Sequence, residues 1–385
     1  MGRSPVEGPP PHPRPRLCLF TRAWRAAGTG LYTSELARGM AEAGIDVTFV
    51  APRSSDPRQE RPVAGLRRMR PPHEIPGAGR AANALRSVAR MVLGGVFLAR
   101  ARLSNRLFVV SIMDPLPVAL AMLVLLRLSG AKIIFIAHDP VPHAWHLPPR
   151  LRALEQGAWR LCHRLADALV VLSEPSRRTL ARDMPGLRSP VAVIDHGIFG
   201  ADHPAPLPGS GTILLFGTLR SNKGVLEAME GAALAHARAE RPFRLVIRGG
   251  GHRDEGAYLD AVRHAAARAG EAVDLKVGFV GEEEVPRLLA GCDALLMPYR
   301  DFHSQSGVAM LAAGHARPII ASPAGGLASL IEDGMPGTWI GEEVTGESVC
   351  AAILAFLDEP AAVWNERVAA YHAHVLERYS WRAIG

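Results

Sequence analysis

Residues 28–50, GTGLYTSELARGMAEAGIDVTFV, contain the order of elements that decides the fold: a glycine turn, a helix and a strand. The helical part has apolar residues every three to four positions, at Tyr32, Leu36, Met40 and Ala43. This spacing is typical of an amphipathic helix with one buried face. The apolar run Leu17–Phe20 precedes the stretch and Asp46–Val50 closes it. We therefore expect a strand–helix–strand unit with two parallel strands in one sheet.

The same alternation continues along all 385 residues. The expected strands of the first half are Leu17–Phe20, Asp46–Val50, Leu107–Ile112, Lys132–His138, Ala168–Ser173 and Val191–His196. Those of the second half are Thr212–Gly217, Phe243–Gly249, Val273–Val280, Ala294–Pro298 and Pro318–Ser322. Most are continuous apolar runs, as in parallel strands that helices cover on both faces. The pattern predicts an α/β protein of two doubly wound, Rossmann-like domains facing across a cleft.

A Pro/Gly-rich break, GADHPAPLPGSG at residues 200–211, separates the two series and predicts the linker. We expect a flexible Pro-rich tail at 1–15 and a first domain at 16–199. The second domain is expected at 212–365, followed by a C-terminal helical segment at 366–385.

Composition narrows the class of protein. The net charge is +7, and only three of the 44 basic residues are lysines, Lys132, Lys223 and Lys276.

The four cysteines are far apart, which favours buried thiols in a reducing compartment over disulfides or a zinc site. The N-terminus lacks the apolar core of a signal peptide, and the longest apolar run, Leu116–Leu126, is too short to span a membrane. We expect a cytoplasmic protein that is at most peripheral to the membrane.

Most of the local positive charge lies between Arg53 and Arg106. The expected helix Ala81–Leu103 mixes apolar residues with four arginines, Arg86, Arg90, Arg100 and Arg102. A basic amphipathic helix is typical of a membrane-surface or anionic-acceptor site, and the alternative is a packed helix with solvated arginines. Nucleic acid is not expected as a partner, because aromatic residues are not interleaved with the arginines for base stacking.

Two motifs of the first domain are candidates for the ligand site. Gly28 and Gly30 form a turn before a helix N-terminus, which suits a loop lining the cleft, but the third glycine of a dinucleotide fingerprint is absent. His138 and Asp139 follow a strand, where reactive groups collect in such sheets. His138 could hydrogen-bond a sugar or assist proton transfer, and Asp139 could orient it or take a proton. A turn fixed by two prolines is the structural alternative.

The second domain carries two candidate phosphate loops. Arg220 and Lys223 follow a strand and precede a helix, where backbone N–H groups and the helix dipole favour an anion. Gln305, Ser306 and Gly307 open a later helix in the same way. A solvated turn is the alternative to a phosphate site.

Taken together, the motifs resemble glycosyltransferase family 4, a family of GT-B fold, from about Arg16 to Gly385. The segments that carry the resemblance include residues 28–52, AHDPVPH, ADALVVLSEPSRRTL, VIDHGI, LLFGTLRSNKG, VGFVGEEEVPRLLAGCDALLMPYRD, SQSGVAMLAAGHARPIIASPAGGL and the closing YSW. The resemblance implies that the second domain binds a nucleotide-sugar donor and the first an acceptor. It implies that Lys223 contacts the donor diphosphate, with Arg220 as a second cation, and that Phe279, Val280 and Gly281 flank the nucleotide base. It places His138 at the cleft, and Gly28 and Gly30 near the donor phosphates.

The chain departs from the family at a pair of glutamates eight positions apart. The corresponding residues are His303 and Leu311, or Ser304 and Ala312, depending on the anchor of the alignment. No DxD motif is present, so we expect no metal and no other cofactor. The resemblance implies a retaining hexosyltransferase that acts on a lipid-linked or glycan precursor at the inner face of the membrane. The alternatives are a transferase-like protein without catalysis that binds a nucleotide or another transferase, and a two-domain sugar-nucleotide epimerase.

Overall fold

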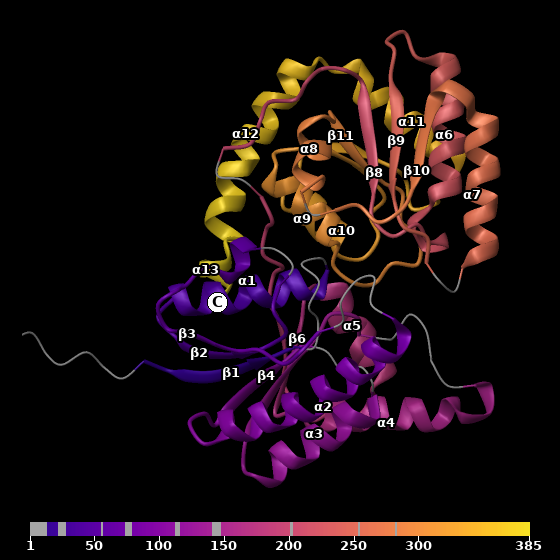
Figure 1. The fold of residues 1–385 in the computed structure, drawn as a ribbon. Helices are drawn as coiled ribbons and strands as arrows, with labels where there is room; N and C mark the ends of the chain where they lie inside the picture. The colour runs from indigo at the N-terminus through magenta and orange to yellow at the C-terminus, as the bar shows by residue number, and fades with distance from the viewer. Residues whose placement is uncertain are drawn as a thin grey trace, which may run out of the picture.

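The computed structural model describes residues 14–21, 28–54, 57–73, 79–111, 116–140, 148–200, 203–252, 255–281 and 283–385. Two parallel sheets, each covered by helices on both sides, lie one above the other (Figure 1). The expected fold class, two doubly wound Rossmann-like domains, is confirmed.

The first domain contains a seven-stranded parallel sheet in the order β3-β2-β1-β4-β5-β6-β7. Its strands are β1 (Arg16–Phe20), β2 (Asp46–Val50), β3 (Leu66–Met69), β4 (Leu107–Val110), β5 (Lys132–Ala137), β6 (Ala168–Val171) and β7 (Val191–Val193). Its helices are α1 (Thr29–Glu42), α2 (Arg80–Arg102), α3 (Leu116–Leu128), α4 (Arg152–Leu165) and α5 (Glu174–Asp183), with 3-10 turns η1 (Pro57–Glu60) and η2 (Pro149–Leu151).

The second domain contains a six-stranded parallel sheet in the order β10-β9-β8-β11-β12-β13. Its strands are β8 (Thr212–Phe216), β9 (Arg244–Gly249), β10 (Val273–Val277), β11 (Ala294–Met297), β12 (Ile319–Ala321) and β13 (Gly337–Trp339). Its helices are α6 (Val225–Arg238), α7 (Gly256–Ala269), α8 (Val285–Ala290), α9 (Gly307–Gly314), α10 (Gly326–Glu332) and α11 (Gly346–Asp358), with 3-10 turns η3 (Ser221–Lys223) and η4 (Gly270–Ala272). The chain ends with α12 (Ala361–Arg378) and α13 (Trp381–Ile384).

Burial follows the expected pattern of two-sided sheets. The central strands are almost wholly buried, as in β11, whose four residues are each at most 1% exposed. All four cysteines are free and buried, as the sequence predicts, and burial raises the pKa of the Cys18 and Cys292 thiols to about 12. They are therefore unreactive thiols inside the cores rather than nucleophiles.

A buried arginine holds the linker against the second domain. Arg317, 1% exposed, donates from Nε to the Leu289 carbonyl at 2.6 Å. Its Nη1 donates to the Ala205 carbonyl at 2.9 Å and its Nη2 to the Pro206 carbonyl at 3.4 Å. One cation thus satisfies two carbonyl oxygens of the linker and one of α8.

The C-terminal helices connect the two domains. Helix α12 runs from the second domain to the first, where α13 lies beside α1 (Figure 1). The Trp381 indole donates to the Ile198 carbonyl at 2.7 Å and stacks edge-on against Tyr32, with ring centroids 5.1 Å apart. A Cβ at Gly39 would lie 2.0 Å from the Trp381 carbonyl oxygen, so a glycine in α1 lets α13 approach this closely.

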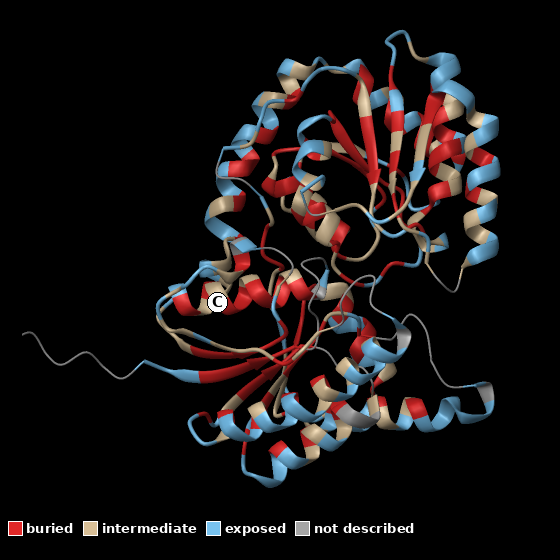
Figure 2. Ribbon diagram, viewed as in Figure 1, coloured by how far each residue is buried: buried red, intermediate tan, exposed pale blue. Residues whose placement is uncertain are grey.

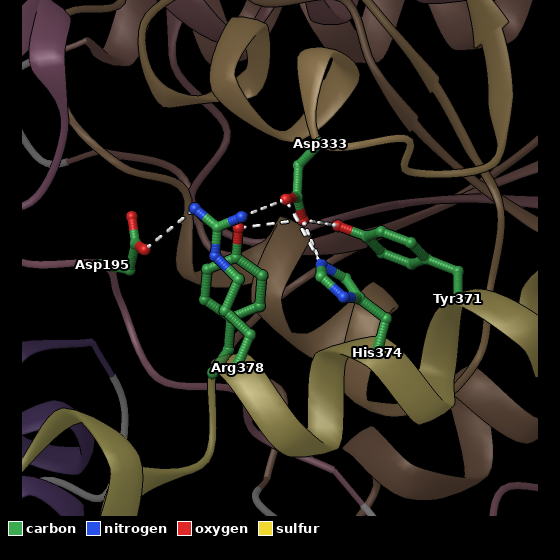
Figure 3. A network of polar contacts seen from close by, with 6 residues as sticks. Asp195, Asp333, Tyr371, His374 and Arg378 are labelled. Carbon is green, nitrogen blue, oxygen red and sulfur yellow. Dashed lines mark hydrogen bonds and ion pairs between the residues drawn. The ribbon is translucent and has the colours of Figure 1, made fainter.

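A polar network fixes α12 to both domains (Figure 3). Asp333, at the end of α10, accepts hydrogen bonds from Tyr371, Tyr379 and Arg378, at 3.0, 2.9 and 2.6 Å, and lies 3.2 Å from His374 Nε2. Arg378 also contacts Asp195 of the first domain at 3.4 Å. Burial together with the Asp333 charge raises the pKa of both tyrosines, which stay neutral donors.

Within the described part of the chain, α2 alone is long and apolar enough to cross a membrane, over Ala81–Arg102 with a mean hydropathy of 1.2. Helix α2 contains no long uninterrupted apolar run, because arginine, glycine and alanine separate its large apolar residues. Only 17% of the apolar 18-residue stretch within this helix is buried, whereas a core helix of this composition would be mostly buried. Figure 2 shows α2 on the outer side of the first domain.

Candidate functional site

Three loops of the second domain converge beyond the carboxyl ends of β8, β11 and β12, which are neighbours in the sheet. Gly224 has a φ of 61°, and a Cβ there would lie 2.0 Å from the Pro298 carbonyl oxygen. The Arg300 amide donates to the Asn222 carbonyl at 2.9 Å. Both contacts join the loop after β8 to the loop after β11. This is the edge of a doubly wound sheet at which ligands bind.

Lys223 is held by two aromatic rings in this place. Its ammonium lies 3.5 Å from the centroid of the Tyr299 ring and 4.3 Å from that of Phe302. Both rings are buried and pack edge-on against each other, so they fix the position of the cation. A lysine ammonium carries three donors, and those that do not face the rings can bind an anion.

Arg220, the second predicted phosphate ligand, forms an ion pair. Its Nε lies 3.3 Å from Glu255 Oε1, and the other carboxylate oxygen accepts from the Ser221 amide at 2.7 Å. These contacts lower the pKa of Glu255 against the opposing effect of its burial. The pair neutralises much of the Arg220 charge, so Lys223 is the stronger electrostatic candidate.

The Gln305–Gly307 turn opens α9 as predicted. Ser306 is the N-cap, and its hydroxyl accepts from the Ala309 amide at 3.4 Å. The Gln305 side chain lies against Gly326, where an added Cβ would be 1.8 Å from its Oε1. The turn is therefore packed into the protein, and the side chains of Gln305 and Ser306 already have partners within it.

The predicted base-flanking residues follow β10, on the same side of the sheet. Phe279 is 70% exposed, and Val280 and Gly281 are half-buried. The Gly278 amide donates to the Gly249 carbonyl at 2.9 Å. A Cβ at Gly249 would in turn lie 1.7 Å from the Gly217 carbonyl oxygen. This stretch is thus adjacent to the loop after β8, with an exposed aromatic ring.

In the first domain, His138 lies at the carboxyl end of β5 and packs edge-on against Tyr32, with ring centroids 4.6 Å apart. Its Nε2 is buried and has no hydrogen-bond partner among the described residues. Burial lowers the pKa of His138 to about 3, although the Asp139 carboxylate acts in the opposite direction. The imidazole is therefore neutral near pH 7, and its Nε2 can form a hydrogen bond to a ligand, as donor or acceptor according to the tautomer.

A row of rings joins His138 to the second domain. Tyr32 packs against His196, at 4.9 Å between centroids, and His196 packs against Phe199 at 5.2 Å. Phe199 reaches α9, since a Cβ at Gly307 would lie 4.0 Å from its ring. Ser176 of α5 donates to the His303 carbonyl at 2.8 Å, a second contact between the domains beside the same turn. The structure thus links the His138 region to the Gln305–Gly307 turn.

The first glycine turn is described only from Gly28 onward, and residues 22–27 lie outside the described part. Gly28 is the N-cap of α1 with a φ of 57°, a conformation that favours glycine. Gly30 is buried in the first turn of α1. Asp139 is exposed, and residues 141–147 of the same loop are also outside the described part.

Glu227 and Arg300 lie at the same edge of the second domain as Lys223, and no sequence motif predicts them as site residues. The Arg300 guanidinium lies 2.7 Å from Glu227 Oε1, while the buried Oε2 has no hydrogen-bond partner within the described residues. Asn222 Oδ1 is likewise buried without a hydrogen-bond partner there. The pair joins the start of α6 to the loop after β11. No local pattern predicts a contact between residues so far apart in the sequence.

The described residues contain no group of three or more His, Cys, Asp or Glu side chains that could hold a metal ion. The expectation that the protein acts without a metal or another cofactor remains a prediction.

Comparisons with known proteins identify the class of the two domains. Residues 26–198 match the family model of Glycosyltransferase Family 4, and residues 210–359 match that of Glycosyl transferases group 1. No curated protein matches the sequence.

Among solved structures, the chain is similar to Anabaena HepE in complex with UDP and glucose, with a TM-score of 0.70 and 16% identity over 96% of this chain and 97% of that one. It is similar to sucrose-phosphate synthase from Thermosynechococcus elongatus, with a TM-score of 0.67 and 17% identity over 97% and 96%. It is also similar to WaaG, a glycosyltransferase involved in lipopolysaccharide biosynthesis, with a TM-score of 0.63 and 15% identity over 96% and 97%. At these identities the likeness is one of fold.

Proposed function

Because the chain belongs to the glycosyltransferases, with a Family 4 first domain and a group 1 second domain, we propose that it transfers a hexose from a nucleoside-diphosphate sugar to a lipid-linked or glycan precursor. The observation that carries the proposal is the position of Lys223, whose ammonium is fixed on two rings where three loops of the second domain meet. Crystal structures of Anabaena HepE, which has the same fold, contain UDP in one case and UDP-glucose in another, which supports a nucleotide-sugar donor.

Each proposed contact follows from the placement of the residues. Lys223 and the N-terminus of α9 receive the diphosphate, which takes the electron pair when its bond to the anomeric carbon breaks. The exposed Phe279 ring stacks on the base. An acceptor oxygen then bonds to the anomeric carbon, and we propose retention of configuration without a metal ion.

His138 is better suited to hydrogen bonding than to proton transfer. Burial disfavours the charged imidazolium that His138 would become on accepting a proton, and it lowers the pKa of His138 to about 3. Its buried Nε2 can instead hold a sugar hydroxyl in place, while Asp139, the exposed carboxylate next to it, is the group able to accept the acceptor proton.

We further propose that the protein acts at the inner surface of the membrane. Helix α2 exposes several large apolar residues together with Arg100, as expected of a helix lying in the headgroup region. Co-sedimentation with liposomes is expected to require anionic lipid and to weaken with salt. Binding that is indifferent to both would contradict this part of the proposal.

The function is tested with purified protein and a panel of nucleotide sugars. Release of nucleoside diphosphate that depends on a glycan or lipid-linked acceptor is the expected result. Donor binding without turnover across the acceptors would favour the alternative, a transferase-like protein without catalysis. Conversion of the nucleotide sugar without any acceptor would favour an epimerase.

A further inference from the structure

The loop after β2 borders a hollow of about 360 Å³ in the first domain. Its lining consists of Arg53, Ser54, Pro57, Glu60 and Arg61, and residues 55–56 of the same loop lie outside the described part. We call this cavity the Arg53–Arg61 hollow. Its volume is within the range of small-molecule sites, about 300–1,000 Å³. Four of the five lining residues are polar or charged, so the hollow suits a polar ligand.

Two arginines that do not line the hollow hold the loop in place. Arg70 pairs with the Glu60 carboxylate and donates to two carbonyls of the loop, each at 3.3 Å. Arg68 donates to the Gln59 carbonyl at 2.8 Å. The second oxygen of Glu60 accepts from the Ser54 amide at 2.7 Å. Glu60, the acidic residue of the lining, is thus committed to Arg70 and to the backbone of the loop.

The two arginines of the lining have no such partners. Neither Arg53 nor Arg61 forms a hydrogen bond or an ion pair within the described residues, and both are exposed. Over residues 51–70 the sequence has six arginines against two acidic residues, so the surroundings are positive. Burial lowers the pKa of Arg70, Glu60 opposes this, and the Arg53 charge adds to the lowering. Like charges at this short range repel one another, and an anion in the hollow would relieve the repulsion.

A phosphate or a carboxylate is the group that this lining recognises. A guanidinium presents its N–H donors in one plane and binds two oxygens of either anion at once. Two guanidinium groups around one hollow offer such donors from two sides. A neutral sugar would leave both charges without a counterion, and an apolar ligand would remove them from water at a cost.

The hollow lies on the side of the sheet where the acceptor is expected. Arg53 and Ser54 follow the carboxyl end of β2, and His138 lies at the carboxyl end of β5. The sheet order places β1 and β4 between these strands, so β2 and β5 are three strand spacings, or roughly 14 Å, apart. An acceptor hydroxyl beside His138 and an anionic group in the hollow would therefore belong to one extended molecule rather than to a single sugar ring.

We propose that the Arg53–Arg61 hollow binds a phosphate or carboxylate group of the acceptor, at a distance from the hydroxyl that receives the sugar. This inference rests on the proposed function, since it names an anionic class of acceptor for the same enzyme. It differs from attachment of α2 to a membrane, because the lining of the hollow includes no residue of α2.

The experiment titrates glucose 6-phosphate, glucuronate and uncharged glucose into the full-length protein by calorimetry at low salt. The test variants are Arg53→Gln and Arg61→Gln, which remove a charge from exposed positions without breaking an ion pair within the described residues. The matched control is Arg67→Gln, which removes the same charge from an exposed position on β3 outside the hollow. A second control, Lys223→Met, reports whether a probe binds the donor loop instead.

At least one of the two anionic probes should bind, and glucose should not. Arg53→Gln and Arg61→Gln should each weaken that binding at least fivefold, whereas Arg67→Gln and Lys223→Met should leave the Kd within twofold of the wild type. The tighter probe then assigns the hollow to a phosphate or to a carboxylate. No binding of either anion, equal weakening by Arg67→Gln, or loss of binding in Lys223→Met would overturn the proposal.

Anionic vesicles distinguish an acceptor from a membrane surface as the source of the anion. Co-sedimentation with vesicles of phosphatidylglycerol and phosphatidylcholine should be the same for Arg53→Gln, Arg61→Gln and Arg67→Gln. Vesicle binding that the first two variants weaken more than Arg67→Gln does would assign the hollow to lipid headgroups and would also overturn the proposal.

The titration contains no nucleotide sugar and needs no turnover. Probe binding by a protein that transfers no sugar would contradict the proposed function alone. Active transfer with an unchanged KM for the acceptor in Arg53→Gln and Arg61→Gln would contradict the role of the hollow alone.

Discussion

Replacing Lys223 by methionine tests the donor site while keeping the protein folded. Methionine has a similar length and can lie on the Tyr299 and Phe302 rings through its thioether. The lost cation–π contacts contribute about 0.5–1 kcal/mol each, and sulfur–aromatic contacts of about 0.3–1.5 kcal/mol replace them. We therefore expect the free energy of unfolding to change by no more than about 1 kcal/mol.

The effect on the donor should be larger, because a hydrogen bond to a charged group contributes about 1.5–3 kcal/mol. At about 1.4 kcal/mol for each factor of ten, Lys223→Met should raise the Kd of the nucleoside diphosphate about 10- to 150-fold. The assay is calorimetric titration with whichever of UDP, ADP and GDP the wild type binds most tightly.

Lys276→Met is the matched control, since it removes the same charge from an exposed position on β10 of the same domain. Its Kd should stay within twofold of the wild type. If Lys223→Met also binds the diphosphate within twofold of the wild type while remaining folded, the reasoning that assigns Lys223 to the diphosphate is wrong.

Three further predictions concern stability, each measured by urea denaturation. Burial lowers the pKa of His163 to about 4, below the value of about 6.5 for an exposed histidine, so the unfolded chain takes up a proton as the pH falls from 7.5 to 5.5. The free energy of unfolding should fall by about 1.4 kcal/mol over this pH range because of His163 alone, and His163→Phe should remove this contribution. A pH dependence that is the same in His163→Phe as in the wild type would contradict the argument. Asp333→Asn should lower the free energy of unfolding by about 3 kcal/mol. Asp195→Asn breaks only an exposed ion pair and should lower it by less than about 1 kcal/mol. Equal losses would show that Asp333 is not the centre of the network. Arg317→Met leaves several buried carbonyl oxygens without a donor and should cost at least about 3 kcal/mol, and a loss under 1 kcal/mol would show that water replaces it.

The central strands could be predicted from the sequence because two-sided burial requires continuous apolar runs. Strand β2 has the predicted limits, Asp46–Val50, and the other predicted strands differ only at their ends. The missed strands, β3 and β13, lie at the edges of the sheets. Strand β3 has the sequence LRRM with none of its four residues fully buried, so its backbone pairing with β2 leaves no apolar pattern to detect.

The candidate site could be predicted only where its residues adjoin a strand end and a helix start. Lys223 and the Gln305–Gly307 turn meet this condition. The partners of these residues do not, because Tyr299 lies 76 positions after Lys223 and Glu255 lies 35 positions after Arg220. Such contacts arise from the packing of neighbouring strands, and this packing decides which predicted cation remains available to an anion.

The packing around each cation explains why a single lysine is the main candidate for the donor diphosphate in a chain whose cations are almost all arginines. The other two lysines are exposed, and Lys132 pairs with Asp167 at 3.1 Å. At Lys223 a compact ammonium lies over two rings, with donors left for a second partner. An arginine there would stack its flat guanidinium on one ring and direct its N–H groups along the plane of that stack. Hence Lys223→Arg, although it keeps the charge, should not restore the donor affinity that Lys223→Met loses.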